Sequence, residues 1–370
     1  MTENIVHIPV EKLRKFMIDV FTTVKDTKGN SVPQEEAEII ADILMASDLH
    51  GITSHGVQRL KMYYDRLKAG QQFAKTEITT IKETETTATL DANHGMGHVA
   101  AYNSMKIAIK KAKKYGIGGV AITNSTHFGI AGYFPLMAIE EGCIGICCTN
   151  ARPSIAPTFG IEPMMGTNPL TFGIPTDEEF PFLLDCATSI TQRGKIEVKS
   201  RTADPVPEGW VINKDGDLAI DSVKILEDLG KGDAALLPLG GAGEILGGHK
   251  GYGYAAVVEI LSAALSGGPF MKDLTLAKGY KLGHFFLAIN IESFISIDIF
   301  KKIAGNICRS LRDSKKAPGQ DRIYTAGEKE YYSRKALEKS GIPINKSIQD
   351  DLLQLAKELD LKKEEYGFTF

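Results

Sequence analysis

The segment 47–60 carries the residues best suited to acid–base chemistry, with Ser54, His55 and Arg59 close together and His50 just upstream. A histidine can take up or release a proton near neutral pH. An arginine can hold a carboxylate through two parallel hydrogen bonds. This combination suits an enzyme that acts on a small hydroxy or keto acid.

A second polar segment, 122–133, places His127 directly after Asn124, Ser125 and Thr126. It leaves a predicted strand and enters a predicted helix, and open α/β sheets bind their ligands at such positions. His127 is therefore a candidate for abstracting or delivering a proton. The competing interpretation is a histidine that only caps the following helix.

Three further segments are candidates for ligand contacts. Asp185 ends an apolar run and could orient a histidine or polarise a ligand hydroxyl, or else cap a helix. The glycine-rich stretch 236–254 contains Lys250, and its backbone could approach a phosphate at a helix start. Its glycines could instead serve only tight turns. The proline-rich stretch 150–175 is either a functional loop or a packed one.

Several sharper motifs are absent or incomplete. His94 and His98 have i, i+4 spacing but lack the glutamate of H-E-x-x-H, so we expect no metal site. Ser54 and His55 are adjacent, and side chains at adjacent positions are expected to point in different directions. Without a G-x-S-x-G elbow, a serine hydrolase is also disfavoured.

Hydrophobic periodicity predicts the elements that position these residues. Two helices come first, 10–24 and 33–49, the second with Ser31 as its N-cap. Strands and helices then alternate, which predicts an α/β sheet covered on both faces. The predicted strands are 118–123, 143–149, 180–185, 211–212 and 284–291, and the predicted helices are 99–115 (ended by Gly116), 131–141, 251–265, 299–311, 328–340 and 346–359. No full G-x-G-x-x-G follows a strand, which disfavours a Rossmann fold.

Composition sets the broad class. A length of 370 residues predicts about two domains, and 43% hydrophobic with 24% charged residues is typical of globular proteins. A net charge of −3 gives no reason to expect nucleic acid or an anionic membrane as a partner. The apolar stretch 252–265 is too short to span a bilayer, and no signal peptide is visible. Five cysteines without metal-type pairs predict reduced thiols and a cytoplasmic location.

Taken in order, several segments resemble the type 2 malate/L-lactate dehydrogenase family, which includes L-sulfolactate and ureidoglycolate dehydrogenases. The matching segments are 47–51, 54–59, 124–129, 149–150, 165–169, 184–189, 207–210, 249–253 and 283–286. The resemblance implies a three-layer mixed α/β sheet unlike the Rossmann fold, a helical subdomain built from both termini, and a homodimer. The corresponding division is 1–77 and 298–370 for the terminal subdomain and 78–297 for the central cofactor- and substrate-binding domain.

The resemblance also implies roles for individual residues. His127 matches the proton-transferring histidine; Ser54, His55 and Asp185 match a proposed relay; and Arg59 matches the substrate-carboxylate clamp. His50 stands where many members have arginine, which points to a role in substrate choice. Ala151 replaces a serine. The implied cofactor-binding residues are Asn150, Ala151, Asp185, Cys186, Ala187, Lys250, Gly327 and Glu328.

The sequence therefore predicts a dehydrogenase that uses NAD or NADP and oxidises a small 2-hydroxy acid, with L-malate expected first. Arg193, Lys195 and Lys199 are candidates for meeting a 2′-phosphate. L-Lactate, L-sulfolactate, ureidoglycolate and a cyclic imino acid are alternative substrates within the family. The alternative from another class is a non-catalytic dinucleotide-binding protein.

Overall fold

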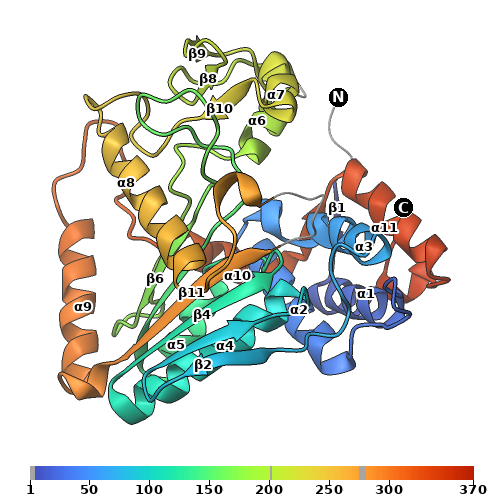
Figure 1. Cartoon of the computed structure of the whole chain (residues 1–370), viewed down its shortest axis with the longest axis horizontal. Helices are drawn as coiled ribbons and strands as arrows, with labels where there is room; N and C mark the ends of the chain where they lie inside the picture. The colour runs from blue at the N-terminus through green and yellow to red at the C-terminus, as the bar shows by residue number, and fades with distance from the viewer. Residues whose placement is uncertain (1–4, 201, 275–280) are drawn as a thin grey trace.

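A seven-stranded mixed sheet forms the centre of the molecule (Figure 1). The computed structural model describes residues 5–200, 202–274 and 281–370. The strand order is β2–β3–β4–β11–β5–β6–β7; β3 and β4 run parallel, and the other neighbouring pairs run antiparallel. The strands are β2 (Thr79–Glu83), β3 (Thr87–Asp91), β4 (Ile117–Ser125), β5 (Cys143–Thr149), β6 (Leu170–Ile174), β7 (Phe182–Cys186) and β11 (Leu282–Asn290).

One face of the sheet is covered by α4 (Gly97–Tyr115) and α5 (Tyr133–Glu140). Small residues let the helices approach the strands closely. A Cβ at Gly118 of β4 would lie 2.1 Å from the carbonyl oxygen of Ala108 in α4. Phe134 and Phe286 fill the space between the layers and are fully buried. This face therefore forms a continuous apolar core.

The opposite face is only partly covered, by α8 (Gly248–Glu259) and the π-helical turn Ile260–Ala264 that continues it. Along β11, buried Phe286 alternates with half-buried Phe285 and Leu287. Within one chain, the predicted covering of both sheet faces is therefore complete on the face of α4 and α5 and partial on the face of α8.

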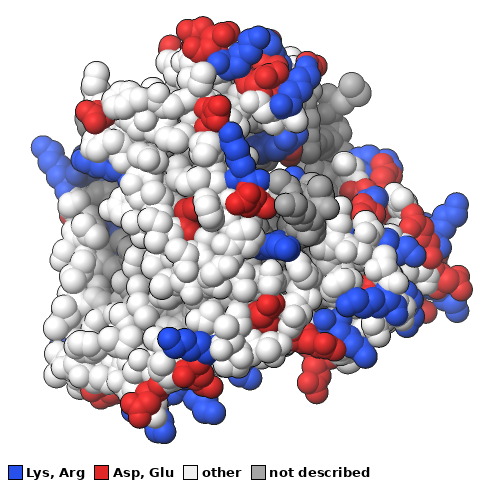
Figure 2. Space-filling model, in the orientation of Figure 1, with Lys and Arg blue, Asp and Glu red and all other residues white. Residues whose placement is uncertain are grey.

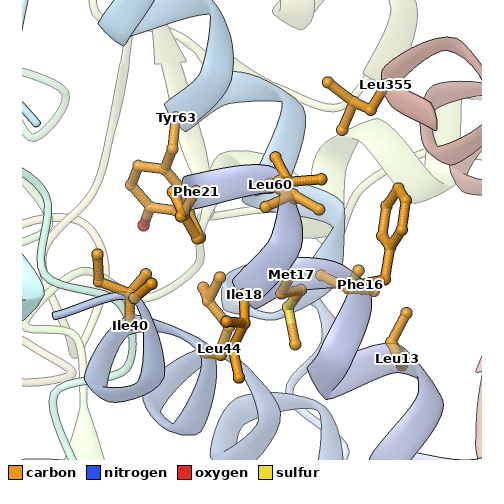
Figure 3. Close-up of a cluster of buried hydrophobic side chains, with 14 of the residues drawn as sticks. Leu13, Phe16, Met17, Ile18, Phe21, Ile40, Leu44, Leu60, Tyr63 and Leu355 are labelled. Carbon is orange, nitrogen blue, oxygen red and sulfur yellow. The ribbon is translucent and has the colours of Figure 1, made fainter. Parts of the chain in front are cut away.

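A second core joins the two ends of the chain. It is built by α1 (Val10–Thr23), α2 (Gln34–Leu49), α3 (Leu60–Lys68) and α11 (Lys346–Glu358), and β1 (Val6–Ile8) pairs antiparallel with β12 (Ile342–Ile344). Figure 3 shows Phe16, Leu60 and Leu355 pointing into this core. The helical subdomain formed from both termini is therefore present, as the resemblance implied. The numerical limits at 77/78 and 297/298 stay predictions.

The helices α9 (Ile297–Arg312) and α10 (Glu328–Ser340) connect the sheet to this terminal subdomain. α10 contacts α2. α9 packs against the turn between β6 and β7, where Arg309 pairs with Asp177 at 2.9 Å. Among the described residues, no helix is long and apolar enough to cross a membrane.

A small lobe forms from β8 (Val211–Asn213), β9 (Leu218–Ala219), β10 (Ala234–Leu236), α6 (Arg193–Ser200) and α7 (Ser222–Lys231). It has its own core, which includes Ile196, Val211 and Leu236. Of this lobe, the sequence pattern predicted only the strand at 211–212.

Two predictions of local structure were wrong, and one predicted helix is present with shifted limits. Ser31 does not cap α2, because its hydroxyl donates to the carbonyl of Val24 at 2.8 Å and Pro33 occupies the N-cap. The stretch 150–175 is not wholly irregular, since it contains β6. The helix predicted at 251–265 starts earlier, at Gly248, and changes to π geometry after Glu259.

Candidate active site

Two histidines that are far apart in the sequence meet at the junction of the terminal subdomain and the sheet. His55 lies in a tight 3-10 turn, Thr53–His55, which follows α2. His127 follows the end of β4. Their rings stack with centroids 5.5 Å apart and an angle of 21° between the planes. The fold thus brings together the two residues that the sequence singled out for proton transfer.

The His127 ring is held through its Nδ1 atom, which lies 2.6 Å from the Tyr63 hydroxyl and accepts the Gly129 N–H at 3.3 Å. Burial, and then the neighbouring His55 and Arg66, hold the pKa of His127 well below its usual value. The neutral ring is the form that can accept a proton. Gly132 rather than His127 occupies the N-cap of α5, so the simple capping interpretation does not apply.

The sequence pattern did not identify Tyr63 as a functional residue. It lies on the buried face of α3, and an aromatic residue at that spacing is indistinguishable from core packing. Its ring does pack against buried neighbours, with the Phe21 ring centroid at 6.4 Å. Its hydroxyl nevertheless reaches His127, so Tyr63 combines a packing role with a polar one.

Ser54 and His55 do interact, contrary to the expectation that adjacent side chains point apart. The Ser54 Oγ lies 2.9 Å from the His55 Nδ1. The expectation used side-chain directions of an α-helix, whereas these residues lie in a tighter 3-10 turn where a short serine reaches the next ring. Burial, with a smaller effect of Arg59, lowers the pKa of His55 to about 4.

Arg59 is anchored beside the two histidines. Its Nε donates to the carbonyl of Ser54 at 2.6 Å. Within the part of the chain that the structure describes, its two Nη groups have no hydrogen-bond partner. The free end of the guanidinium matches the requirement for holding a carboxylate.

Asp48, at the end of α2, was not predicted as a site residue, but its carboxyl group holds the turn that carries His55. It is 2% exposed, and its Oδ2 accepts the N–H of Val57 at 2.7 Å. A Cβ at Gly56 would lie 1.9 Å from the Asp48 Oδ1, so only glycine fits there. Burial raises the pKa of Asp48 to about 7. The carboxylate fixes the loop that carries His55.

A cavity of about 250 Å³ is lined by residues that lie close in sequence to the paired histidines, although neither ring lines it. Its apolar floor includes Ile52 and Ile130, and β7 contributes Leu183, Leu184 and Asp185. His50 and the segment 324–330 complete the walls. A cavity with an apolar floor and a few polar groups is typical of a small-molecule site.

Asp185 lies in this cavity wall and not in a hydrogen-bonded relay with Ser54 and His55. Its Oδ2 accepts the N–H of Gly132 at 2.7 Å, and its Oδ1 accepts the Thr171 hydroxyl at 3.2 Å. Burial raises its pKa. Among the described residues no hydrogen bond joins Asp185 to Ser54 or His55. The relay stays a prediction.

The residues predicted to bind a cofactor are more dispersed. Gly327 lines the cavity, and Cys186 and Ala187 follow Asp185 and are half-buried. Lys250 is exposed on the first turn of α8.

Three predicted cofactor contacts are engaged within the protein. The Asn150 amide accepts the Gly283 N–H at 2.9 Å and donates to Glu259 at 3.4 Å. The Ala151 N–H donates to Asn168 at 3.2 Å. Glu328 is fully buried and pairs with arginines. These groups hold the backbone around the site, and direct contact with a cofactor stays a prediction for them.

Comparison with known proteins decides the family. A family model described as malate/L-lactate dehydrogenase matches residues 8–353. The chain belongs to the malate/L-lactate dehydrogenase family. The resemblance drawn from the sequence motifs is therefore confirmed, and the protein is an oxidoreductase whose family implies a nicotinamide cofactor.

Relatives in this family are similar over almost their whole length. Malate dehydrogenase from Pyrococcus horikoshii is 45% identical over 362 residues, which covers 97% of each chain. L-Sulfolactate dehydrogenase from Methanocaldococcus jannaschii is 36% identical over 359 residues, covering 96% of this chain and 98% of the relative. The solved structure of malate dehydrogenase from Entamoeba histolytica has a TM-score of 0.93 at 44% identity and covers 97% of this chain and 99% of its own. The non-Rossmann mixed α/β fold of the malate/L-lactate dehydrogenase family is thus confirmed.

Proposed function

We propose that this chain interconverts L-malate and oxaloacetate, with NAD or NADP as the hydride carrier. The observation that carries the proposal is the stacked pair of His55 and His127 with the free end of Arg59 beside it. The similarity to malate dehydrogenases over 97% of the chain favours malate among 2-hydroxy acids.

Arg59 binds the carboxylate next to the reacting carbon. Its Nε is already used by the Ser54 carbonyl, so the guanidinium is held in one orientation before substrate arrives. A preorganised fork loses little freedom when it forms two parallel hydrogen bonds. This contact sets the hydroxyl-bearing carbon close to the histidine rings.

His127 moves the proton at its Nε2 atom. When Nδ1 donates its hydrogen to the Tyr63 oxygen, Nε2 is free to take the substrate hydroxyl proton. The ring then becomes an imidazolium, and in the reverse direction the same Nε2–H returns its proton to the keto oxygen as the hydride arrives. In the other neutral tautomer Nδ1 accepts from Gly129 and Nε2 already carries a hydrogen, so that form cannot take the substrate proton. His55 is hydrogen-bonded to Ser54, and its ring stacks on the His127 ring and holds it in place.

The cavity lined by Ile52, Ile130 and Asp185 fits the nicotinamide end of the cofactor. Its apolar floor suits a flat ring, and Asp185, Thr325 and Lys329 supply polar groups at its walls. When bound there, the nicotinamide supplies the acceptor or donor of the hydride. A volume of about 250 Å³ is too small for a whole dinucleotide, so the remainder extends outside. We keep Cys186 and Ala187 as predicted contacts of the nicotinamide, and Asn150, Ala151, Lys250 and the backbone of the Gly327–Glu328 turn as predicted contacts of the remainder.

The test is the consumption of NADH and NADPH with oxaloacetate, pyruvate and sulfopyruvate. We expect oxaloacetate to react fastest, and the better coenzyme decides between NAD and NADP. A faster reaction with pyruvate or sulfopyruvate would reassign the substrate to L-lactate or L-sulfolactate. Cofactor binding without turnover on this panel would favour a ureido or imino acid substrate, or a non-catalytic binding protein.

We also propose that the chain works as a homodimer. On α9, four large apolar side chains at i, i+4, i+8 and i+12 spacing are each more than half exposed: Ile299, Ile303, Ile307 and Leu311. On α8 and the π-helical turn that continues it, Tyr254, Val257 and Ile260 are also exposed. In Figure 2 the left half of the molecule, which includes α8 and α9, shows few charged side chains compared with the terminal subdomain at the right.

Exposed apolar side chains gathered on neighbouring elements in this way are typical of protein–protein contact surfaces, and a second copy would cover the half-buried sheet face as well. A cytoplasmic location is proposed with it. The five cysteines carry free thiols, which the reducing cytoplasm maintains.

A further inference from the structure

The segment 322–327, here called the strap, is the last part of the connection from α9 to α10 and crosses the open edge of β7. Its Ala326 carbonyl accepts the N–H of Leu183 in β7 at 3.1 Å. Gly327 has φ +90°, and a Cβ there would lie 3.0 Å from the Leu183 Cβ. The strap therefore lies directly against the strand that carries Asp185, and residues 324–327 form one wall of the cavity.

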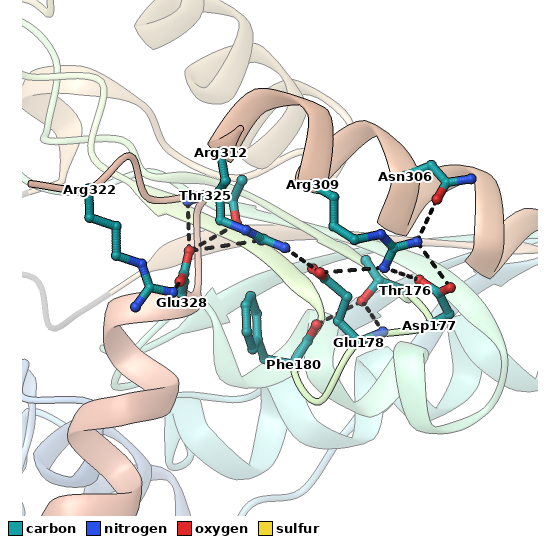
Figure 4. A network of polar contacts seen from close by, with 10 residues as sticks. All are labelled: Thr176, Asp177, Glu178, Phe180, Asn306, Arg309, Arg312, Arg322, Thr325 and Glu328. Atoms are coloured by element: carbon teal, nitrogen blue, oxygen red, sulfur yellow. Dashed lines mark hydrogen bonds and ion pairs between the residues drawn. The ribbon is translucent and has the colours of Figure 1, made fainter. Parts of the chain in front are cut away.

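The strap is held by Glu328, the first residue of α10. Glu328 is fully buried, and its Oε2 accepts the backbone N–H of Thr325 at 3.1 Å. Its Oε1 accepts from Arg322, at the start of the strap. The Arg312 Nη1 lies 3.9 Å from the Glu328 Oε2. Both carboxylate oxygens are thus directed to protein groups around the strap (Figure 4).

Arg312 extends this contact to α9 and the sheet. Its Nη1 donates to the Thr325 hydroxyl at 3.0 Å, and its Nη2 donates to Glu178 in the β6–β7 turn. The Arg312 side chain is 14% exposed and does not line the cavity. The network in Figure 4 therefore joins the strap, α9 and the sheet edge through two mostly buried arginine–carboxylate contacts.

A buried carboxylate is stable only when its oxygens are hydrogen-bonded and its charge is paired. Removing it would leave Arg312 without this partner and would release the Thr325 N–H. The strap would then be held to β7 mainly by the single hydrogen bond from Leu183.

We infer that Glu328 is a positioning residue: its carboxylate, with Arg312 and Arg322, fixes the strap as a wall of the cavity without touching the cofactor. The inference rests on the proposed function in one respect, that the cofactor occupies this cavity. It assigns to the Glu328 side chain a role different from the direct cofactor contact that the family resemblance implied.

The first experiment measures NADH and NADPH dissociation constants for Glu328→Gln, Arg312→Gln and the double variant. Each single change should raise the dissociation constant of the preferred coenzyme about tenfold. The dissociation constant of the double variant should be at most about twice that of either single variant, because both changes release the same strap. With saturating coenzyme, kcat should stay within about threefold of wild type.

Glu338→Gln is the matched control. Glu338 lies on the same helix and pairs with Arg334 at 2.8 Å, but both side chains are about half exposed. An exposed pair contributes little, so coenzyme binding should not change. If Glu328→Gln fails to fold, Arg322→Gln takes its place, because Arg322 is the more exposed partner of the same carboxylate. We expect this variant to bind the coenzyme about threefold more weakly than wild type.

A second readout does not depend on the proposed function. Amide hydrogen exchange of the coenzyme-free protein should become at least about tenfold faster for Thr325 in Glu328→Gln and Arg312→Gln, since the strap loosens. Unchanged exchange in both variants would overturn the inference. Weaker coenzyme binding in Glu328→Gln with normal binding in Arg312→Gln would also overturn it, because Glu328 would then contact the coenzyme directly. Faster strap exchange in a protein that binds neither coenzyme would support the inference and refute the proposed function.

Discussion

Tyr63 and His127 show how one hydrogen bond links core packing to chemistry at the residue scale. The phenol lies 2.6 Å from the Nδ1 of His127, and so holds the ring with its Nε2 available for proton transfer. Tyr63→Phe keeps the packing and removes this bond. We expect kcat to fall by about tenfold or more with a smaller change in KM for the keto acid.

Tyr64→Phe provides the control for this variant. Tyr64 is the next residue, and its hydroxyl donates to Glu358 at 2.7 Å on the far side of α3. Its loss should leave kcat unchanged. Equal rates for Tyr63→Phe and wild type would remove Tyr63 from the proton path.

The burial of His98 makes the free energy of unfolding depend on pH. It is fully buried against the Tyr63 ring, and within the described residues its ring nitrogens have no hydrogen-bond partner. Burial lowers its pKa to about 3, below the usual 6.5. Below pH 6.5 the unfolded chain therefore takes up a proton at His98 that the folded protein does not. The contribution of neutral His98 to the free energy of unfolding is thus complete above pH 6.5 and is lost as the pH falls toward 3.

His98→Phe removes this proton uptake. Between pH 7 and 5 the variant should lose about 2 kcal/mol less unfolding free energy than wild type, by urea denaturation at each pH. Identical pH slopes for the two proteins would contradict the lowered pKa of His98.

Much of the chemistry at this scale was predictable from the sequence, because Ser54, His55, Arg59 and His127 have distinctive types and spacing. Tyr63 and Asp48 were not, since a buried tyrosine and a helix-end aspartate acquire their roles only through contacts made in the folded chain. The 3-10 turn also reversed the expectation for the Ser54–His55 pair.

At the scale of elements, the start of α4 positions the loop that carries His127. A Cβ at Gly97, the first residue of α4, would lie 2.2 Å from the Thr126 carbonyl oxygen and 2.6 Å from that of His127. Gly97→Ala should therefore push the loop away, lower the unfolding free energy by about 1–3 kcal/mol, and reduce kcat about tenfold or more.

Gly253→Ala in α8 should have the opposite effect on stability. Its Cβ would have no heavy atom within 4 Å. Replacing a helical glycine by alanine in open space stabilises by about 0.5–1 kcal/mol. Thermal unfolding of both variants measures the contrast, and a stabilised, fully active Gly97→Ala protein would show that the contact between α4 and the loop is not needed.

Elements with long, regular hydrophobic periodicity were the ones that the sequence predicted well. The helix at 328–340 and the strand at 143–149 have the predicted limits. The small lobe was mostly missed because its strands are only two or three residues long, too short for a periodic signal. The strap was missed because its position depends on β7 and buried charges rather than on local sequence.

At the scale of the whole molecule, the exposed apolar surface of α8 and α9 predicts self-association. Ile303→Asp places a charge in the middle of the α9 stripe, where Ile303 is 52% exposed. We expect the variant to shift from dimer to monomer at micromolar concentration in sedimentation velocity, because a charge buried in an apolar interface is costly. Ile81→Asp, at a similarly exposed position on the edge strand β2, should remain a dimer.

A monomeric wild-type protein at the same concentration would contradict the proposed homodimer. If Ile303→Asp remains a dimer, the dimer interface lies on a surface other than α9. Neither result would alter the assignment to the malate/L-lactate dehydrogenase family, which rests on the match over residues 8–353.

The central claim is that His127, buried and neutral, carries the proton in a dehydrogenase reaction at this site. The most direct measurement compares L-malate oxidation by wild type and His127→Ala at neutral pH, with coenzyme binding measured on both proteins. We predict that kcat falls by about 10²–10⁴ while the coenzyme dissociation constant stays within about threefold. A variant that oxidises L-malate at the wild-type rate would contradict the account.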